Sequence, residues 1–182
     1  MAVIADLIAP EVDFASIGTN DLCQYLMAVD RMNPEVTSYY QSYHPALFRL
    51  IGYVVERFKQ AGKPICICGE LGGDPLAAPV LVGLGIRKLS MSLSSVAAVK
   101  RALAGFTVKQ MEEMARAVEN MTDGQARNIY RSAQNPWKNK RSVYKCILKK
   151  RQLSIEPVFM RGLRHNSLRW PKDSAAVSKY RI

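Results

Sequence analysis

The sequence predicts an α/β protein built around a parallel sheet. Three short runs of strand-forming residues lie at 12–17, 65–68 and 88–92. Segments with apolar residues at helical spacing separate these runs. Strands that alternate with helices pair in parallel through right-handed crossovers, so the order of elements indicates the fold class.

The first elements are a short helix at 1–8 and the strand at 12–17. Gly18, Thr19, Asn20 and Asp21 follow and are turn formers, so we expect a polar turn directly after the strand. For a bare Asn-Asp pair, an Asx turn without any binding role is an adequate explanation.

A long helix is predicted to begin at His44-Pro45. Its apolar residues recur at i, i+3, i+4, i+7, i+8 and i+11, which places them on one buried stripe. They are Leu47, Leu50, Ile51, Val54, Val55 and Phe58. Gly62 and Pro64 end the helix, and the strand 65–68 follows.

A short helix should open next, with Asp74 as its N-cap and Pro75 in the first helical position. Gly83 and Gly85 are expected to end it before the strand 88–92.

The remaining elements of the body are helical. A helix is predicted at 95–104, and Thr107 with Gln110 forms a capping box for the next one. That helix should turn Val108, Met111, Ala115 and Val118 inward, and a last helix is predicted at 124–133.

Charge divides the chain into a body at 1–134 and a basic tail at 135–182. The body carries 13 basic and 13 acidic residues, so the whole net charge of +11 falls on the tail. The tail has no sustained hydrophobic period and contains scattered prolines, which predicts weak order. Its basic clusters, with Trp137, Tyr144 and Trp170 between them, could contact nucleic acid. We favour a solvated tail over that alternative.

Cysteine usage and the apolar runs predict a cytoplasmic protein. Four cysteines without regular spacing indicate reduced thiols. The first residues lack the pattern of a signal peptide. The longest apolar run, at 76–86, is too short to cross a bilayer.

Polar side chains at two strand ends are the candidate functional groups. Asn20 and Asp21 can bind Mg²⁺ or phosphate-bound water, and Arg31 can form a fork on a phosphate, although it could equally be a surface cation beside Asp30. Parallel α/β folds build active sites at the carboxyl ends of their strands.

Cys68 ends the second strand, immediately before Gly69-Glu70. A buried packing role is the common fate of a free cysteine, and we assign that role to Cys66 on the same strand face. A thiol that is largely protonated near neutral pH can also serve as an acid.

The run S-I-G-T-N-D-L-C-Q-Y at residues 16–25, with Arg31 and C-G-E at 68–70, resembles a signature of the phosphoenolpyruvate-utilising enzymes. Within that family the chain is most similar to the enzyme I type of the sugar phosphotransferase system. The resemblance covers about residues 1–133. It implies that the strands are the last three of a (β/α)₈ barrel, and that the first five strands, a second glutamate metal ligand and the phosphorylatable histidine domain lie outside this sequence.

The resemblance also implies residue roles. Asp21 would be a Mg²⁺ ligand, and Asn20, Asp21 and Arg31 would bind phosphoenolpyruvate. Cys68 would be the catalytic residue that exchanges a proton with the methylene carbon of the substrate.

The function implied by the resemblance is phosphoryl transfer from Mg²⁺-bound phosphoenolpyruvate to a histidine. A histidine-containing phosphocarrier protein would then receive the group, and the enzyme would be a homodimer. Two alternatives remain open: an inactive remnant or partner-dependent half-barrel, and a nucleic-acid-associated protein acting through its tail.

Overall fold

The computed structural model describes residues 1–122 and shows an α/β fold around a short parallel sheet. Strand β1 (Ala15–Gly18) pairs with β2 (Ile65–Cys68), and the register runs from Ala15 opposite Ile65 to Gly18 opposite Cys68. The predicted helix at 124–133 and the basic tail at 135–182 lie outside the described residues. Closure into an eight-stranded barrel stays a prediction.

The third predicted strand is reduced to a single parallel bridge between Ile67 and Leu89. Ile67 N donates to Lys88 O (3.0 Å), and Ser90 N donates to Ile67 O (2.8 Å). The chain then turns into the next helix, which begins at Leu93. The prediction of a strand at 88–92 is therefore right about the pairing and wrong about its length.

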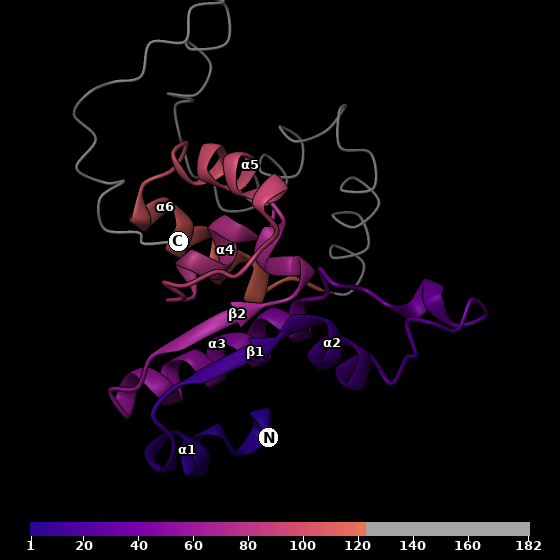
Figure 1. Ribbon diagram of the computed structural model, residues 1–182, viewed down its shortest axis with the longest axis horizontal. Coiled ribbons are helices and arrows are strands. Elements are labelled where there is room, and N and C mark those ends of the chain that lie inside the picture. Colours follow the sequence, from indigo (N-terminus) through magenta and orange to yellow (C-terminus); the bar gives the residue numbers. More distant parts are fainter. Residues whose placement is uncertain (123–182) are drawn as a thin grey trace, which may run out of the picture.

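The two faces of the sheet differ in burial because side chains alternate along a strand. Ile17 and Ile67 are buried on the face that α3 (Pro45–Gln60) covers, and α3 lies behind the strands in Figure 1. On the other face Ser16 is exposed, and Cys66 and Cys68 are half-buried. The strands therefore present a small, partly polar face that the helices of residues 1–122 leave partly uncovered.

The other helical elements of residues 1–122 surround this sheet. None of them is long and apolar enough for a membrane crossing. They are η1 (Ala2–Ile4), α1 (Ala5–Ile8), η2 (Ala9–Glu11), α2 (Thr19–Met27), η3 (Thr37–Tyr39), η4 (Glu70–Gly73), α4 (Ala78–Gly83), α5 (Leu93–Leu103) and α6 (Val108–Glu119).

Helix α3 confirms the predicted start and most of the predicted stripe. His44 is the N-cap, and its ring Nδ1 accepts a hydrogen bond from Ala46 N (3.2 Å). Five of the six predicted residues are buried, whereas Leu50 is only half-buried and Phe48 is buried beside them. The helix ends before Gly62, which has a φ of 67°.

Helix α2 corrects the prediction that a polar turn follows β1. The four turn-forming residues instead include Gly18 as N-cap and the first turn of a helix. Asp21 lies in that first turn, where a carboxylate interacts favourably with the helix dipole. Thr19 and Cys23 lie on one helix face and are buried, so packing overrides their weak helix propensity.

The segment after β2 also departs from the prediction. Asp74 does not cap a helix that begins at Pro75; its carboxylate accepts from Leu76 N (2.7 Å), and α4 begins only at Ala78. Two prolines close together explain the delay, since Pro75 and Pro79 lack the N–H groups that a continuous helix would use.

Helix α6 confirms the capping box of Thr107 and Gln110 in both directions. Its predicted inward residues are buried except Val108, which is 39% exposed. Met114 is buried in its place, because it lies three residues after Met111 on the same face.

Replacing Ala28 by glycine should stabilise the protein. Ala28 ends α2 with a φ of 53°, a left-handed conformation that is unfavourable for a residue with a Cβ. Glycine relieves that strain but loses more entropy on folding, so we expect a net gain of about 0.5–1 kcal/mol. Urea unfolding of the variant and of the parent measures it; an unchanged or lower midpoint would show that the Ala28 backbone is not strained.

Candidate active site at the strand ends

The candidate active site lies where β1 and β2 end side by side. Gly18 and Cys68 are register partners, and each strand leads directly into a helical turn (Figure 1). Helix α2 begins with Thr19, Asn20 and Asp21, and η4 begins with Glu70. The structure therefore brings Asn20, Asp21 and Cys68 to one edge of the sheet, as the sequence predicted.

Two contacts with β1 fix the thiol of Cys68. Ser16 Oγ donates a hydrogen bond to Cys68 Sγ (3.0 Å), and Sγ itself donates to Ile17 O (3.4 Å). Both partners are 51 or 52 residues away in the chain, so the pairing of the strands creates the contacts. Cys68 is only half-buried, and its sulfur is positioned by these two hydrogen bonds with β1.

Thr19 and Gly69 join the end of β2 to the start of α2. Thr19 is 1% exposed, and its hydroxyl donates to Cys68 O (3.2 Å). Gly69 has a φ of 105°, and a Cβ there would lie 2.7 Å from Thr19 Oγ1. The same Cβ would lie 3.4 Å from Thr19 N and 3.6 Å from Asn20 N. Glycine therefore leaves space beside the first amides of α2, which is where a helix binds anions.

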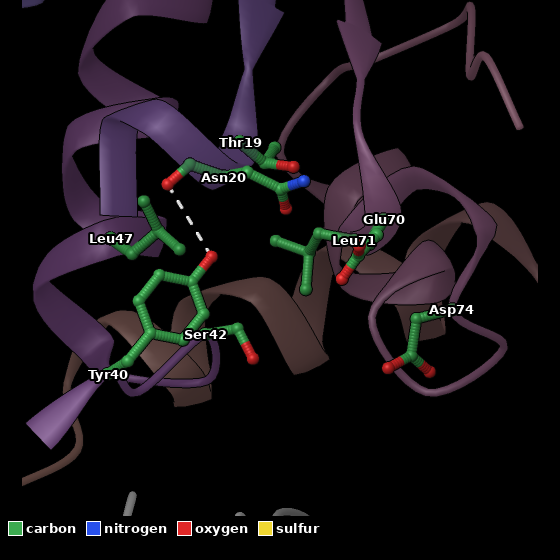
Figure 2. Close-up of a pocket in the computed structure, with 8 residues that line it drawn as sticks. All are labelled: Thr19, Asn20, Tyr40, Ser42, Leu47, Glu70, Leu71 and Asp74. Atoms are coloured by element: carbon green, nitrogen blue, oxygen red, sulfur yellow. Dashed lines mark hydrogen bonds between the residues drawn. The ribbon is translucent and has the colours of Figure 1, made fainter. Parts of the chain in front are cut away.

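Tyr40 contacts the backbone of Asn20 and is influenced by several ionisable groups. Its hydroxyl donates to Asn20 O at 3.5 Å (Figure 2). Burial and then the neighbouring Cys23 raise the pKa of Tyr40 to about 12, with a lowering effect from Arg31 and a raising effect from Glu70. Arg31 and Glu70 are thus within electrostatic reach of a phenol that stays neutral at physiological pH.

The backbone of Arg31 is held by polar contacts, while its side chain is exposed. Arg31 N donates to Gln24 Oε1 (3.2 Å), and Thr37 Oγ1 donates to Arg31 O (3.4 Å). Asp30 was a possible ion-pair partner, but its carboxylate accepts from Met32 N (2.8 Å). The backbone contacts of Arg31 therefore fix the loop from which its exposed side chain extends.

A small pocket of about 120 Å³ lies beside this edge (Figure 2). Asn20 and Leu71 point into it from opposite sides, and the carboxylates of Glu70 and Asp74 make one side of the pocket acidic. Cys68, Asp21 and Arg31 do not line this pocket, which therefore adjoins the candidate site and is not identical with it.

The residues present fit a Mg²⁺ ion that is shared with a phosphate. Asp21 is exposed, and its carboxylate lies near the end of β1, since a Cβ at Gly18 would be 3.8 Å from Asp21 Oδ2. No group of three or more His, Cys, Asp or Glu side chains among residues 1–122 could hold a metal ion by itself. Mg²⁺ commonly takes one or two carboxylates, substrate phosphates and water, so Asp21 suits a partial ligand set.

Sequence reasoning missed Ser16, Thr19 and Tyr40. Ser16 could have been found from the strand register, since it precedes Gly18 by two residues and must share a face with Cys68. Thr19 and Tyr40 carry no such signal, because their contacts depend on how α2 and the following loop pack.

Comparisons with known proteins identify a family for this chain. A family profile described as "PEP-utilising enzyme, PEP-binding domain" matches residues 1–108, which is more than half of the chain. The chain is 46% identical over 121 residues to a phosphoenolpyruvate-protein phosphotransferase of Bacillus subtilis, and 47% identical over 122 residues to that of Staphylococcus epidermidis. The protein of the same name from Bacillus sp. (strain S) is 48% identical over 122 residues.

Each of these alignments covers 66% of this chain and 20–21% of the relative, so the chain spans about a fifth of the length of the proteins it matches. The matched residues include both strand ends and every predicted site residue. The strand-end architecture and the match over 1–108 lead to one assignment: this chain belongs to the PEP-utilising enzymes, through their PEP-binding domain.

Proposed function

We propose that the edge formed by β1, α2 and β2 binds phosphoenolpyruvate as part of a phosphoenolpyruvate-dependent protein phosphotransferase. The observation that carries the proposal is the junction of Cys68 with the first turn of α2, through Thr19 and Gly69. Through that junction the N-terminal end of α2, which we propose as the phosphate site, adjoins the residue that bears the thiol. A substrate with a phosphate and an adjacent reactive carbon matches such a pair.

The phosphate binds at the start of α2. The amides of Thr19 and Asn20 lie beside the space that Gly69 leaves, and Asn20 and Arg31 supply side-chain donors. Asp21 would hold Mg²⁺, which supplies charge neutralisation for the transferring phosphoryl group. We propose these roles for Asn20, Asp21 and Arg31 from their positions and from the family to which the chain belongs.

Cys68 acts at the carbon end of the substrate. When the phosphoryl group leaves for a histidine, an enolate remains. The S–H bond of Cys68 breaks, its proton forms a new C–H bond with the methylene carbon, and the electron pair stays on sulfur. Pyruvate and a thiolate are the products, and water then reprotonates the sulfur.

The remaining partners lie outside this chain. The relatives are named phosphoenolpyruvate-protein phosphotransferases, and we propose that the acceptor is a histidine on another domain or chain. A histidine-containing phosphocarrier protein then takes the group in a cytoplasmic sugar phosphotransferase system, and the complete enzyme is a homodimer.

A hybrid protein tests this function. The matching segment of the Bacillus subtilis relative is replaced by this chain, and pyruvate release from phosphoenolpyruvate is measured with Mg²⁺ and a phosphocarrier protein. We expect turnover in the ordinary range of enzymes, about 1–10³ s⁻¹. The chain by itself should give none, since its described residues supply one candidate metal carboxylate. A folded hybrid without turnover would refute the proposal, and an active isolated chain would refute its dependence on the rest of the enzyme.

A second candidate is a half-barrel that works only with a separate partner chain. The open sheet face and Phe14, which is 68% exposed immediately before β1, favour it. Mixing this chain with the separately produced remainder of the relative should then restore pyruvate release without covalent fusion. Activity in the fused hybrid alone would exclude this candidate.

A further inference from the structure

We infer that Ser16 is a positioning residue for Cys68, and that it stabilises the thiolate which Cys68 forms after it gives up its proton. The inference rests on the proposed function for its place in the reaction, and on geometry for the interaction. Nothing in the family match assigns a role to Ser16.

The direction of the hydrogen bonds carries the argument. Ser16 Oγ lies 3.0 Å from Cys68 Sγ and donates to it, whereas the thiol proton has its own acceptor in Ile17 O at 3.4 Å. When the S–H bond breaks, the contact with Ile17 O loses its donor. The contact from Ser16 remains and becomes a hydrogen bond to an anion, which is stronger than one to a neutral group.

The site is rigid enough for this contact to matter. β1 and β2 pair over their full lengths, so Ser16 and Cys68 belong to one hydrogen-bonded ladder. Thr19 is 1% exposed and holds the carbonyl of Cys68 at 3.2 Å, which fixes the backbone from which the thiol projects. Ser16 is exposed, so water can return a proton to the sulfur beside it.

The titratable residues of the surrounding elements are unchanged in a Ser16 variant. On the elements that adjoin the end of β2, they are Asp21 on α2, Glu70 on η4, Lys88 on the segment that bridges to Ile67, and Cys66 on β2 itself. A change confined to Ser16 therefore isolates the hydroxyl.

The test measures how fast iodoacetamide alkylates Cys68 in the full chain as a function of pH. Fragment-ion mass spectrometry of the peptide that carries both Cys66 and Cys68 assigns the label to Cys68, and the other cysteines lie in other peptides. Ser16→Ala should raise the pH of half-maximal alkylation by about 0.5–1 unit, which lowers the rate about three- to tenfold at a fixed pH below that midpoint. Cys23 is fully buried and burial raises its thiol pKa, so it should stay slow in every variant and report folding.

Matched variants make the result specific. Ser16→Thr keeps the hydroxyl and should keep the pH profile of the parent protein. Ser16→Val removes the hydroxyl but introduces a good strand former, and it should behave like Ser16→Ala. Ser90→Ala removes another exposed hydroxyl from the segment that pairs with the opposite edge of β2, and should leave the profile unchanged. The inference would be overturned if Ser16→Ala and Ser16→Val both kept the pH of half-maximal alkylation of the parent protein. It would also be overturned if Ser90→Ala shifted that pH as much as Ser16→Ala does.

The hybrid enzyme separates this inference from the proposed function. There Ser16→Ala should lower kcat about tenfold with little change in KM, and Ser16→Thr should restore it. An inactive parent hybrid with a clear alkylation shift would reject the function and keep the interaction. An active hybrid with unchanged kcat in Ser16→Ala would reject the role of Ser16 and keep the function.

Discussion

Gly83→Ala is expected to destabilise the fold by about 3 kcal/mol or more. Gly83 is the last residue of α4, and a Cβ there would lie 2.0 Å from the carbonyl oxygen of Met111 and 3.0 Å from Glu112 N. Both are backbone atoms of α6, so relief requires that the two helices separate. That separation would expose Met111 and Met114, which are buried between them and their neighbours.

Gly52→Ala is the matched control, because Gly52 is also helical and also lies in a tight place. Its Cβ would lie 2.6 Å from Glu119 Oε1 and 3.3 Å from a Leu84 methyl group. The end of the Glu119 side chain can move outward, and partial burial already raises the pKa of that carboxyl, so exposure to water favours its charged form.

We therefore expect Gly52→Ala to change stability by less than about 1 kcal/mol, since alanine also favours the helix. Thermal unfolding of both variants followed by circular dichroism measures the difference. Equal melting midpoints for the two variants would mean that α4 and α6 are not as close as the structure shows.

Cys68→Ser is expected to lower pyruvate formation in the hybrid enzyme by about 10²–10⁴-fold, the range that a general acid contributes. A hydroxyl is a much weaker acid than a thiol, yet it is close in shape and can donate to Ile17 O and accept from Ser16 as the thiol does. Binding of phosphoenolpyruvate should be affected far less, because the proposed phosphate site is at α2 and does not include Cys68.

Cys66→Ser is the control for that experiment. Cys66 lies on the same face of β2 and is half-buried like Cys68, but it is two residues further from the strand end. Its loss should change kcat by less than about threefold and act mainly on stability. Equal loss of activity in both variants would remove the assignment of the acid to Cys68.

The parts of the fold that follow local rules were predictable from the sequence. Helix α3 has a long apolar stripe and clear stop signals, and the capping box of α6 is specified by two residues three positions apart. Strand β2 was predicted at its observed bounds, because isoleucine and cysteine alternate between two turn signals. These features depend on residues that are close in the chain.

The parts that depend on packing were not predictable in the same way. Thr19–Met27 has weak helix formers at its start, and only the burial of Thr19 and Cys23 against the rest of the fold explains the helix. The candidate site shows the same division. Asn20, Asp21, Arg31 and Cys68 came from a linear signature, whereas Ser16 and Tyr40 became visible only through contacts across the sheet and the α2–α3 loop.

Protection of Cys68 by substrate tests the central claim most directly, because it asks whether phosphoenolpyruvate occupies the edge between α2 and β2. The alkylation rate of Cys68 in the hybrid enzyme is measured alone, with Mg²⁺, with Mg²⁺ and inorganic phosphate, and with Mg²⁺ and phosphoenolpyruvate. We expect saturating phosphoenolpyruvate with Mg²⁺ to slow alkylation at least about tenfold, and inorganic phosphate to protect less, since it fills only the α2 end. Unchanged alkylation of Cys68 at a concentration of phosphoenolpyruvate that saturates turnover would place the substrate elsewhere and contradict the account.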